Sequence, residues 1–296
     1  EAFSSNTFEN NESGAVAITA NNIGELDNAS TYNGVIWVED GEVSEDATWP
    51  AFDSNYEFAS NVSIEAGVIT LEPGVQIAVT DGRRFTFGVD ATIIANGTME
   101  APIRIYGKNE EPGYWLGIRI DSNSSENSFD YVSVEHAGGD KLETFSEPAN
   151  VLVQDGRLKV KNSTFSNSDG FGIAHREGST FGEFANNLFE NNATGSLHMT
   201  ANNLGELDNA STYNDPVHVE DGEVTEDATW PAVDSFYAIV GNVSIESAEI
   251  TIEAGSNFEI SDTRRINFEV DSSIIANGTM EAPIRFYGKS AEPGYW

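Results

Sequence analysis

Short segments in which apolar and polar residues alternate recur along the whole chain. Each segment spans three to five residues and is followed by a turn rich in Gly, Asn, Asp or Ser. Alternation at period two is typical of a strand with one buried face, and long stretches of 3.6-residue periodicity are missing. The pattern therefore predicts an all-β protein. The side chains that we expect to point into its core include Ile69, Leu71, Phe87, Val89, Ile103, Ile118 and Val134.

A long internal repeat governs the organisation of the chain. Residues 1–115 align with residues 182–296 at an offset of 181 without a gap, and 72 of the 115 aligned pairs are identical. The chain thus holds parts of successive copies of one unit, and we expect it to belong to a longer array. We divide it into the final coils of one unit (1–33), a complete unit (34–214) and the first part of the next unit (215–296).

A finer period lies inside the unit. The segment 160–167 is echoed by the segment 184–191, and strands this short cannot form the long ladders of a sandwich. Stacked as coils of roughly 20 to 25 residues, each strand can pair with the same strand one coil away. This predicts a right-handed parallel β-helix, a β-solenoid built from tandem 181-residue units. With roughly eight coils at about 4.8 Å each, one unit should rise about 40 Å.

Several motifs follow one another in a recognisable order. They are Thr48-Trp49-Pro50, then the segments 69–74, 94–103 and 113–118, and finally Phe129-Asp130-Tyr131-Val132 with its continuation to Gly139. Together they resemble the right-handed parallel β-helix modules, with a pectate-lyase-like fold, that are repeated in large secreted surface proteins and adhesins of Bacteroidetes-like bacteria. The resemblance implies a secreted or cell-surface location. Such modules serve as scaffolds, as adhesins and as carbohydrate-acting domains, so the resemblance implies the fold more specifically than the function.

The charge of the chain is strongly negative. There are 49 acidic and 14 basic residues, giving a formal net charge of −35; the first basic residue is Arg83, and none lies between Arg176 and Arg264. Such a surface repels nucleic acid and anionic membranes, because both are bound through Lys and Arg. It suits a medium of high ionic strength or a bound divalent cation. The chain has no cysteine and no apolar stretch long enough to enter a membrane as a helix.

The densest run of carboxylates occurs once in each copy. Clustered acidic loops can supply the six to eight oxygens that calcium prefers, although this run lacks the spacing of an EF-hand. Solvation of an acidic loop is the simpler interpretation, so we predict no cofactor and keep calcium as the alternative. The calcium candidates are Glu39, Asp40, Glu42, Glu45 and Asp46 in the first copy and Glu220, Asp221, Glu223, Glu226 and Asp227 in the second.

Aromatic and amide side chains offer further candidates. Exposed Trp and Tyr could bind sugar rings, but their recurrence in both copies favours core or turn packing. Stacked asparagines can bond from coil to coil to the backbone of a solenoid. The recurring aromatic residues are Trp49, Tyr56, Tyr114 and Trp115, with Trp230, Tyr237, Tyr295 and Trp296. The predicted asparagine ladder comprises Asn162, Asn167, Asn186, Asn191 and Asn192.

These observations favour a non-catalytic structural role. A gapless repeat duplicates length and surface, as a fibre requires, whereas catalysis needs a single site. We therefore expect a segment of a long extracellular fibre or adhesin that contacts neighbouring units, and that forms a fibre or homo-oligomer. The alternatives are a carbohydrate-binding adhesin module that recognises cell-surface glycans and, third, a calcium-dependent polysaccharide lyase or hydrolase. We expect neither nucleic acid binding nor membrane insertion.

Overall fold

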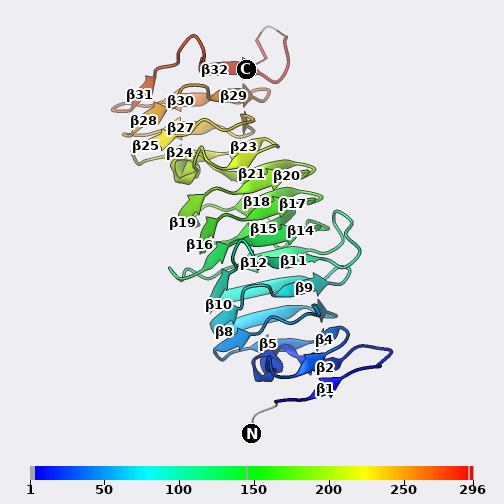
Figure 1. Cartoon of the computed structure of the whole chain (residues 1–296). Helices are drawn as coiled ribbons and strands as arrows, with labels where there is room; N and C mark the ends of the chain where they lie inside the picture. The colour runs from blue at the N-terminus through cyan, green and yellow to red at the C-terminus, as the bar shows by residue number, and fades with distance from the viewer. Residues whose placement is uncertain (1–3, 145, 293, 296) are drawn as a thin grey trace.

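The computed structural model describes residues 4–144, 146–292 and 294–295, and it confirms the all-β prediction. Its strands make up 46% of the chain, and they form stacked sheets whose pairs are all parallel, giving a β-solenoid of about 12 turns. The N-terminus lies at one end of the stack and the C-terminus at the other (Figure 1). Both copies of the repeat therefore lie along one axis rather than side by side.

Each coil contributes strands to up to three faces. The first face consists of β2 (Val16–Thr19), β4 (Ile36–Glu39), β7 (Tyr56–Phe58), β9 (Gln76–Val79), β11 (Ile103–Gly107), β14 (Val132–Glu135), β17 (Thr164–Ser166), β20 (Leu188–Glu190) and β22 (Thr212–Tyr213).

The second face begins at β5 and continues to the C-terminal end of the stack. It consists of β5 (Gly41–Val43), the first halves of β8 (Val62–Leu71) and β10 (Arg84–Asn96), β12 (Gly117–Ile120), β15 (Ala149–Val153), β18 (Phe171–His175), β21 (Gly195–Thr200), β23 (Val217–Glu220), β26 (Tyr237–Ile239), β29 (Asn257–Ile260) and β32 (Arg285–Gly288).

The third face is joined to the second by β8 and β10, which turn the corner between them. It consists of β6 (Ala47–Trp49), the second halves of β8 and β10, β13 (Ser128–Asp130), β16 (Arg157–Lys161) and β19 (Thr180–Ala185). Two 3-10 helices take the place of strands, η1 (Ala20–Glu25) and η2 (Ala201–Glu206). The remaining strands form smaller sheets: β1 (Thr7–Phe8) with β3 (Thr31–Tyr32); β24 (Gly222–Val224), β27 (Val243–Ile245) and β30 (Ile266–Phe268); and β25 (Ala228–Trp230), β28 (Glu249–Ile252) and β31 (Ser273–Ala276).

The core is a column of side chains that repeat from coil to coil. Phe165, Phe189 and Tyr213 stack on successive coils with ring centroids 5.3 Å and 5.6 Å apart. Such offset stacks add to the free energy gained by burial alone. The predicted core positions Ile69, Leu71, Phe87, Ile103, Ile118 and Val134 are all buried, with at most 1% of each residue exposed.

Val89 is the exception, and its predicted inward orientation is wrong. The residue is 73% exposed. The pairing of β10 with β8 shifts register between Phe87 and Asp90, at the corner between two faces. A bulge of this kind interrupts the period-two alternation. Val89, two residues after the inward-pointing Phe87, therefore points outward.

The recurring aromatic residues that the structure describes lie mostly in the core. Trp49, Tyr56, Trp115, Trp230 and Tyr237 are at most 1% exposed, so they pack the interior and cannot form a platform for sugars. The side chains of Tyr114 and Tyr295 are half-buried, and Trp296 lies outside the described residues.

The asparagines fall into two groups, which corrects the predicted ladder. Asn162, Asn167, Asn186 and Asn191 have φ angles of 49° to 56°, so they occupy left-handed turn positions that asparagine tolerates well. The bonds from side chain to backbone are made instead by the next residues along, Asn187 and Asn192. The prediction is therefore confirmed for Asn192 alone among the five.

Asn187 and Asn192 link adjacent coils in the same way. Their Nδ2 atoms donate to the carbonyl oxygens of Val160 and Phe165, each at 3.0 Å. Their Oδ1 atoms accept from the backbone N–H groups of Ser163 and Ser168 at 3.1 and 3.2 Å. Because both asparagines are buried, these bonds satisfy backbone groups that water cannot reach.

Strands that are equivalent in sequence lie on different faces in the two copies. The first copy places β2, β4, β7 and β9 on the first face, whereas their equivalents β21, β23, β26 and β29 lie on the second. From β4 to β22 the first face advances by seven turns, and β23, the equivalent of β4, follows one face later. One unit therefore spans about seven and one third turns, which corresponds to about 35 Å rather than 40 Å.

Candidate binding groove beside a 3-10 helix

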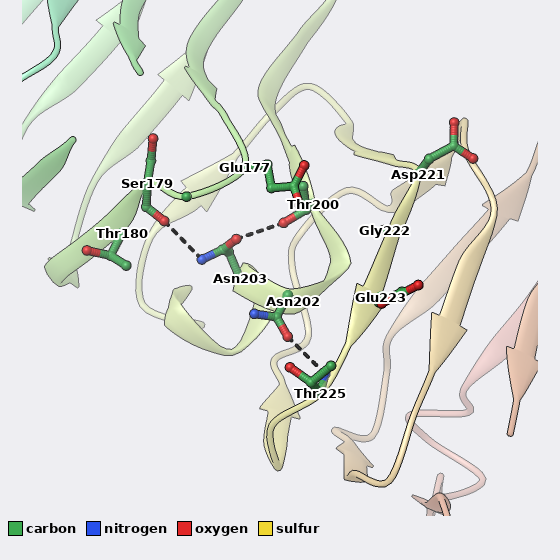
Figure 2. Close-up of a pocket in the computed structure, with 11 residues that line it drawn as sticks. Glu177, Ser179, Thr180, Thr200, Asn202, Asn203, Asp221, Gly222, Glu223 and Thr225 are labelled. Carbon is green, nitrogen blue, oxygen red and sulfur yellow. Dashed lines mark hydrogen bonds between the residues drawn. The ribbon is translucent and has the colours of Figure 1, made fainter. Parts of the chain in front are cut away.

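A polar groove of about 610 Å³ lies beside η2 and spans three successive coils (Figure 2). Backbone and side chains from the β18–β19 turn form one wall, and the start of β24 forms the other. The groove is lined by Glu177, Gly178, Ser179, Thr180, Thr200, Asn202, Asn203, Asp221, Gly222, Glu223 and Thr225.

The groove exists because η2 replaces a strand. On the third face η2 contacts both β19 and β24, in the position where an intervening strand would pair with both. The inward residues Ala201 and Leu204 are buried and hold the helix against the core. A 3-10 helix cannot continue the parallel ladder, so its polar side chains face a depression between the neighbouring coils.

Hydrogen bonds fix the floor of the groove. Thr200 Oγ1 donates to Asn203 Oδ1 at 2.7 Å, and Asn203 Nδ2 donates to the carbonyl oxygen of Ser179 at 3.3 Å. Asn202 Oδ1 accepts from the backbone N–H of Thr225 at 3.1 Å, as Figure 2 shows. These bonds tie three coils together, so the groove is preformed and a ligand would not have to order it.

Behind the floor, Glu206 is held by two hydrogen bonds. Its Oε1 accepts from Asn203 Nδ2 at 3.1 Å and its Oε2 accepts from the backbone N–H of Phe181 at 2.8 Å. Burial raises the pKa of Glu206, an effect that these bonds partly oppose. The carboxyl group is thus part of the scaffold of the groove.

The lining is acidic and rich in hydrogen-bonding groups. Glu177, Asp221 and Glu223 contribute carboxylates, and the lining residues include neither a basic nor an aromatic side chain. Such a groove disfavours anions and favours cations or uncharged ligands with many hydroxyl groups.

The first copy carries a shallower version of the same groove. A depression of about 460 Å³ is lined by Thr19, Asn21, Asp40, Gly41 and Glu42, which align with Thr200, Asn202, Asp221, Gly222 and Glu223. The wall that Glu177–Thr180 forms beside the second-copy groove lies outside the aligned residues, so only the other lining residues can be compared. The groove is therefore a property of the repeating unit.

The predicted calcium candidates lie along the rims of these grooves and along the next turn. Their side chains are exposed, except that Glu220 is half-buried. Asp46 and Asp227 have structural partners: their Oδ1 atoms accept from the backbone N–H groups of Val68 and Glu249 at 2.8 and 2.7 Å. Within the residues that the structure describes, no three His, Asp or Glu side chains are grouped so that they could hold a metal ion.

The calcium alternative has a direct test. If calcium is bound, millimolar calcium should raise the melting temperature more than sodium chloride of the same ionic strength, and Asp40→Asn with Asp46→Asn should remove the excess. Asp46→Asn alone also weakens the contact to Val68, so its effect in sodium chloride is the control. Equal melting temperatures in the two salts would leave only screening of the acidic surface.

A second cluster of charged side chains was not predicted from the sequence. On the outer side of the second face, Glu220 Oε2 lies 3.9 Å from His198 Nε2 and 3.7 Å from Arg176 Nη1. Burial lowers the pKa of His198 to about 4 and raises that of Glu220. His198 aligns with Ala17, so it cannot belong to a functional site that every repeat unit shares. Its proximity to Arg176 arises only when the coils stack.

A small apolar cluster lies beside these groups and outside the main core. It consists of Leu142, Ala149, Leu152, Phe171 and Ala174. The ring of Phe171 packs against His198 and His218, with centroids 5.1 and 5.0 Å apart. His198 is 7% exposed, so this cluster stabilises the segment around Leu142 on the sheet rather than opening a reaction site.

His175 gives the fold a testable dependence on pH. The residue is fully buried, and burial lowers its pKa to about 4. Its Nε2 lies 3.8 Å from Glu206, and neither ring nitrogen has a hydrogen-bond partner. In the unfolded chain the imidazole binds a proton below about pH 6.5, whereas the folded chain binds it only below about 4.

Stability should therefore fall as the pH falls from 6.5 to 4, by up to about 3 kcal/mol from this group. His175→Gln should remove that part of the decline, measured by urea unfolding at pH 7 and pH 4.5. Glu206 titrates in both proteins, so its contribution largely cancels in the comparison. Equal slopes for parent and variant would contradict the assignment.

Comparisons with protein families, with curated proteins and with solved structures found no match for the chain. In the part of the chain that the structure describes, no helix has the length and apolar character needed to cross a membrane.

Proposed function

We propose that this chain is a non-catalytic stretch of a long extracellular fibre or adhesin, in which 181-residue units are stacked end to end. The observation that carries the proposal is the continuity of the stack across the repeat. β21, in the second copy, pairs in parallel with β18, which precedes that copy, within one hydrogen-bonded sheet. Solenoids grow by such nearest-neighbour contacts, so added units add length without a new interface.

The proposed array also accounts for how core positions would be covered along the stack. Phe268, Ile274 and Phe286 are 39% to 44% exposed. Their counterparts in the first copy, Phe87, Ile93 and Ile105, are at most 1% exposed because the following coils cover them. In the proposed array, coils equivalent to those that cover Phe87, Ile93 and Ile105 would cover their counterparts in every unit and pair the strand edges.

The composition supports a surface location. The chain has no cysteine, so its stability does not depend on disulfide bonds. Its net charge of −35 suits a medium of high ionic strength, in which salt screens the repulsion between carboxylates. By its resemblance to right-handed β-helix modules of pectate-lyase-like fold, we place it among the secreted surface proteins of Bacteroidetes-like bacteria. Its partners would then be neighbouring units of the same chain and other fibres or glycans at the cell surface.

The length of the particle tests the proposal. We would compare the 296-residue chain with a chain extended by residues 116–296 once more, using small-angle X-ray scattering and electron microscopy. The maximum dimension should grow by about 35 Å, the rise of seven and one third turns, at constant cross-section. A wider particle of unchanged length would contradict an end-to-end array.

A second candidate function is carbohydrate binding in the groove beside η2. The specific observation in its favour is that the groove recurs at equivalent positions of both copies. Asn202→Leu and Asp221→Leu would remove hydrogen-bonding groups from the second-copy groove. Binding to a panel of glycans should fall in both variants, while Asp234→Ala, away from the groove, should leave it unchanged. If no glycan binds the parent chain, this candidate is excluded for that panel.

A further inference from the structure

We propose that successive units of the array are rotated by about one third of a turn around the solenoid axis, so that the array presents each unit's groove on three sides in succession. The inference rests on the proposed array, but the rotation itself is encoded within this one chain. It concerns the arrangement of the interaction surface rather than the chemistry of the groove.

The pairing of strands requires the rotation. β4 pairs with β2 and β7 on the first face, whereas its equivalent β23 pairs with β21 and β26 on the second. The 3-10 helices follow the same rule. η1 directly follows β2, on the first face, whereas η2 directly follows β21, on the second.

The rotation arises because the coils of one unit do not add up to a whole number of turns. On the first face, β2, β4 and β7 start at Val16, Ile36 and Tyr56, so the early coils are short and even. Further along, β11, β14 and β17 start at Ile103, Val132 and Thr164, so the coils between them are clearly longer. The 181-residue unit thus closes after seven turns plus one face rather than after a whole number of turns. Because every strand is locked to its neighbours by parallel pairing, a slip to a whole number would break the register of the sheets.

The consequence is a three-sided display. Equivalent grooves recur about every 35 Å along the axis, but on a given side only every third unit, after about 22 turns or roughly 105 Å. A flat, rigid surface can meet only one groove in three. The arrangement fits partners that approach the fibre from all sides, such as flexible or soluble polyhydroxylated chains, which could use every unit.

Distances between spin labels in the 296-residue chain test the rotation. The chain has no cysteine, so labels can be placed at chosen exposed sites. Asp40 lies at the corner after β4, and Asn214 lies at the same corner seven turns later. Asp221, the sequence equivalent of Asp40, and Glu226 lie at the two other corners. We would pair Asp40→Cys in turn with Asn214→Cys, Asp221→Cys and Glu226→Cys.

The pair of Asp40 and Asn214 should give the shortest distance, about 34 Å for seven turns. The other two pairs should each be about 5–8 Å longer, because they also cross between corners of a coil whose faces are about five to six residues wide. If Asp40 and Asp221 give the shortest distance, or if all three distances agree, the rotation is wrong. Singly labelled chains control for distances between molecules, and melting curves confirm that each variant folds.

This result is independent of the proposed fibre. A rotated pair of copies within a chain that never extends would uphold the rotation and overturn the array. An extended array with unrotated copies would do the reverse. The spin-label distances and the measurement of particle length can therefore contradict the rotation and the array independently of each other.

Discussion

Replacing Phe87 with aspartate is expected to lower the free energy of unfolding by more than about 4 kcal/mol and to open the coils around β8, β10 and β12. Phe87 is fully buried, its ring centroid lies 4.5 Å from that of Phe85, and it pairs in register with Ile64 and Ile120. Truncating a buried Phe costs about 3–5 kcal/mol, and an unpaired carboxylate in the core adds to that loss. Chemical unfolding followed by circular dichroism measures the change, and limited proteolysis locates it.

The matched control is Val89→Asp. Val89 lies two residues further along the same strand but is 73% exposed, so the same charge enters solvent. Its effect on the free energy of unfolding should stay within about 0.5 kcal/mol. Similar losses in the two variants would mean that the inward and outward faces of β10 have been assigned wrongly.

The contrast between these two residues shows how far the sequence predicts this fold. Alternation and the 181-residue repeat predicted a parallel stack and placed six of seven tested side chains correctly in the core. They failed at Val89 because a bulge depends on how two coils of different shape meet, which no local pattern records. In the same way, the sequence predicted that asparagines bond to the backbone from coil to coil. Of the five residues named, however, only Asn192 makes such bonds, and the other four lie at turn positions.

The groove was only partly predictable. The acidic runs that border it were identified, but its floor was not, because Thr200, Asn203 and Ser179 come together only when coils of specific length stack. The segment that contains η2 lies within the aligned repeat, and its two adjacent asparagines, Asn202 and Asn203, were the available signal. The rotation between copies also depends on coil lengths, which are uneven along the chain.

The rotation changes the expected role of the acidic runs. The runs that contain Asp40 and Asp221 recur at a fixed interval along the axis, but they face different sides. At about 35 Å apart, they lie well beyond the Debye length of about 8–10 Å at ordinary salt, so the acidic runs of successive units hardly repel one another. Any stabilisation by salt should therefore arise within a run and between adjacent coils, and it should be the same per unit in short and long arrays.

Asn127 carries the second large expected effect. The residue is fully buried immediately before β13, on the third face, and its side chain links three coils. Its Oδ1 accepts from the backbone N–H of Ile93 at 2.9 Å. Its Nδ2 donates at 3.0 Å to the carbonyl oxygen and hydroxyl of Ser122 and to the carbonyl oxygen of Arg157. Both the oxygen and the nitrogen of the amide are thus hydrogen-bonded to groups of three coils.

Asn127→Leu keeps the approximate volume of the side chain but removes all of these bonds. The backbone N–H of Ile93 and the carbonyl oxygen of Arg157 then lose this partner, whereas the carbonyl oxygen of Ser122 still accepts from the N–H of Arg157 at 2.9 Å. Each backbone group left without a partner costs about 1–3 kcal/mol. Because these losses share one site and are not additive, we expect the free energy of unfolding to fall by about 3–5 kcal/mol. Hydrogen exchange should show that the amide of Ile93, which donates directly to Asn127, becomes less protected.

The matched control is Asn123→Leu, four residues earlier in the same connection, where the side chain is exposed. It should change the free energy of unfolding by no more than about 0.5 kcal/mol. If Asn127→Leu were as mild as this control, water would have to replace the amide between the coils. The stack would then tolerate a hydrated gap in its wall, and the coil-to-coil bonds of Asn187 and Asn192 would lose their proposed importance as well.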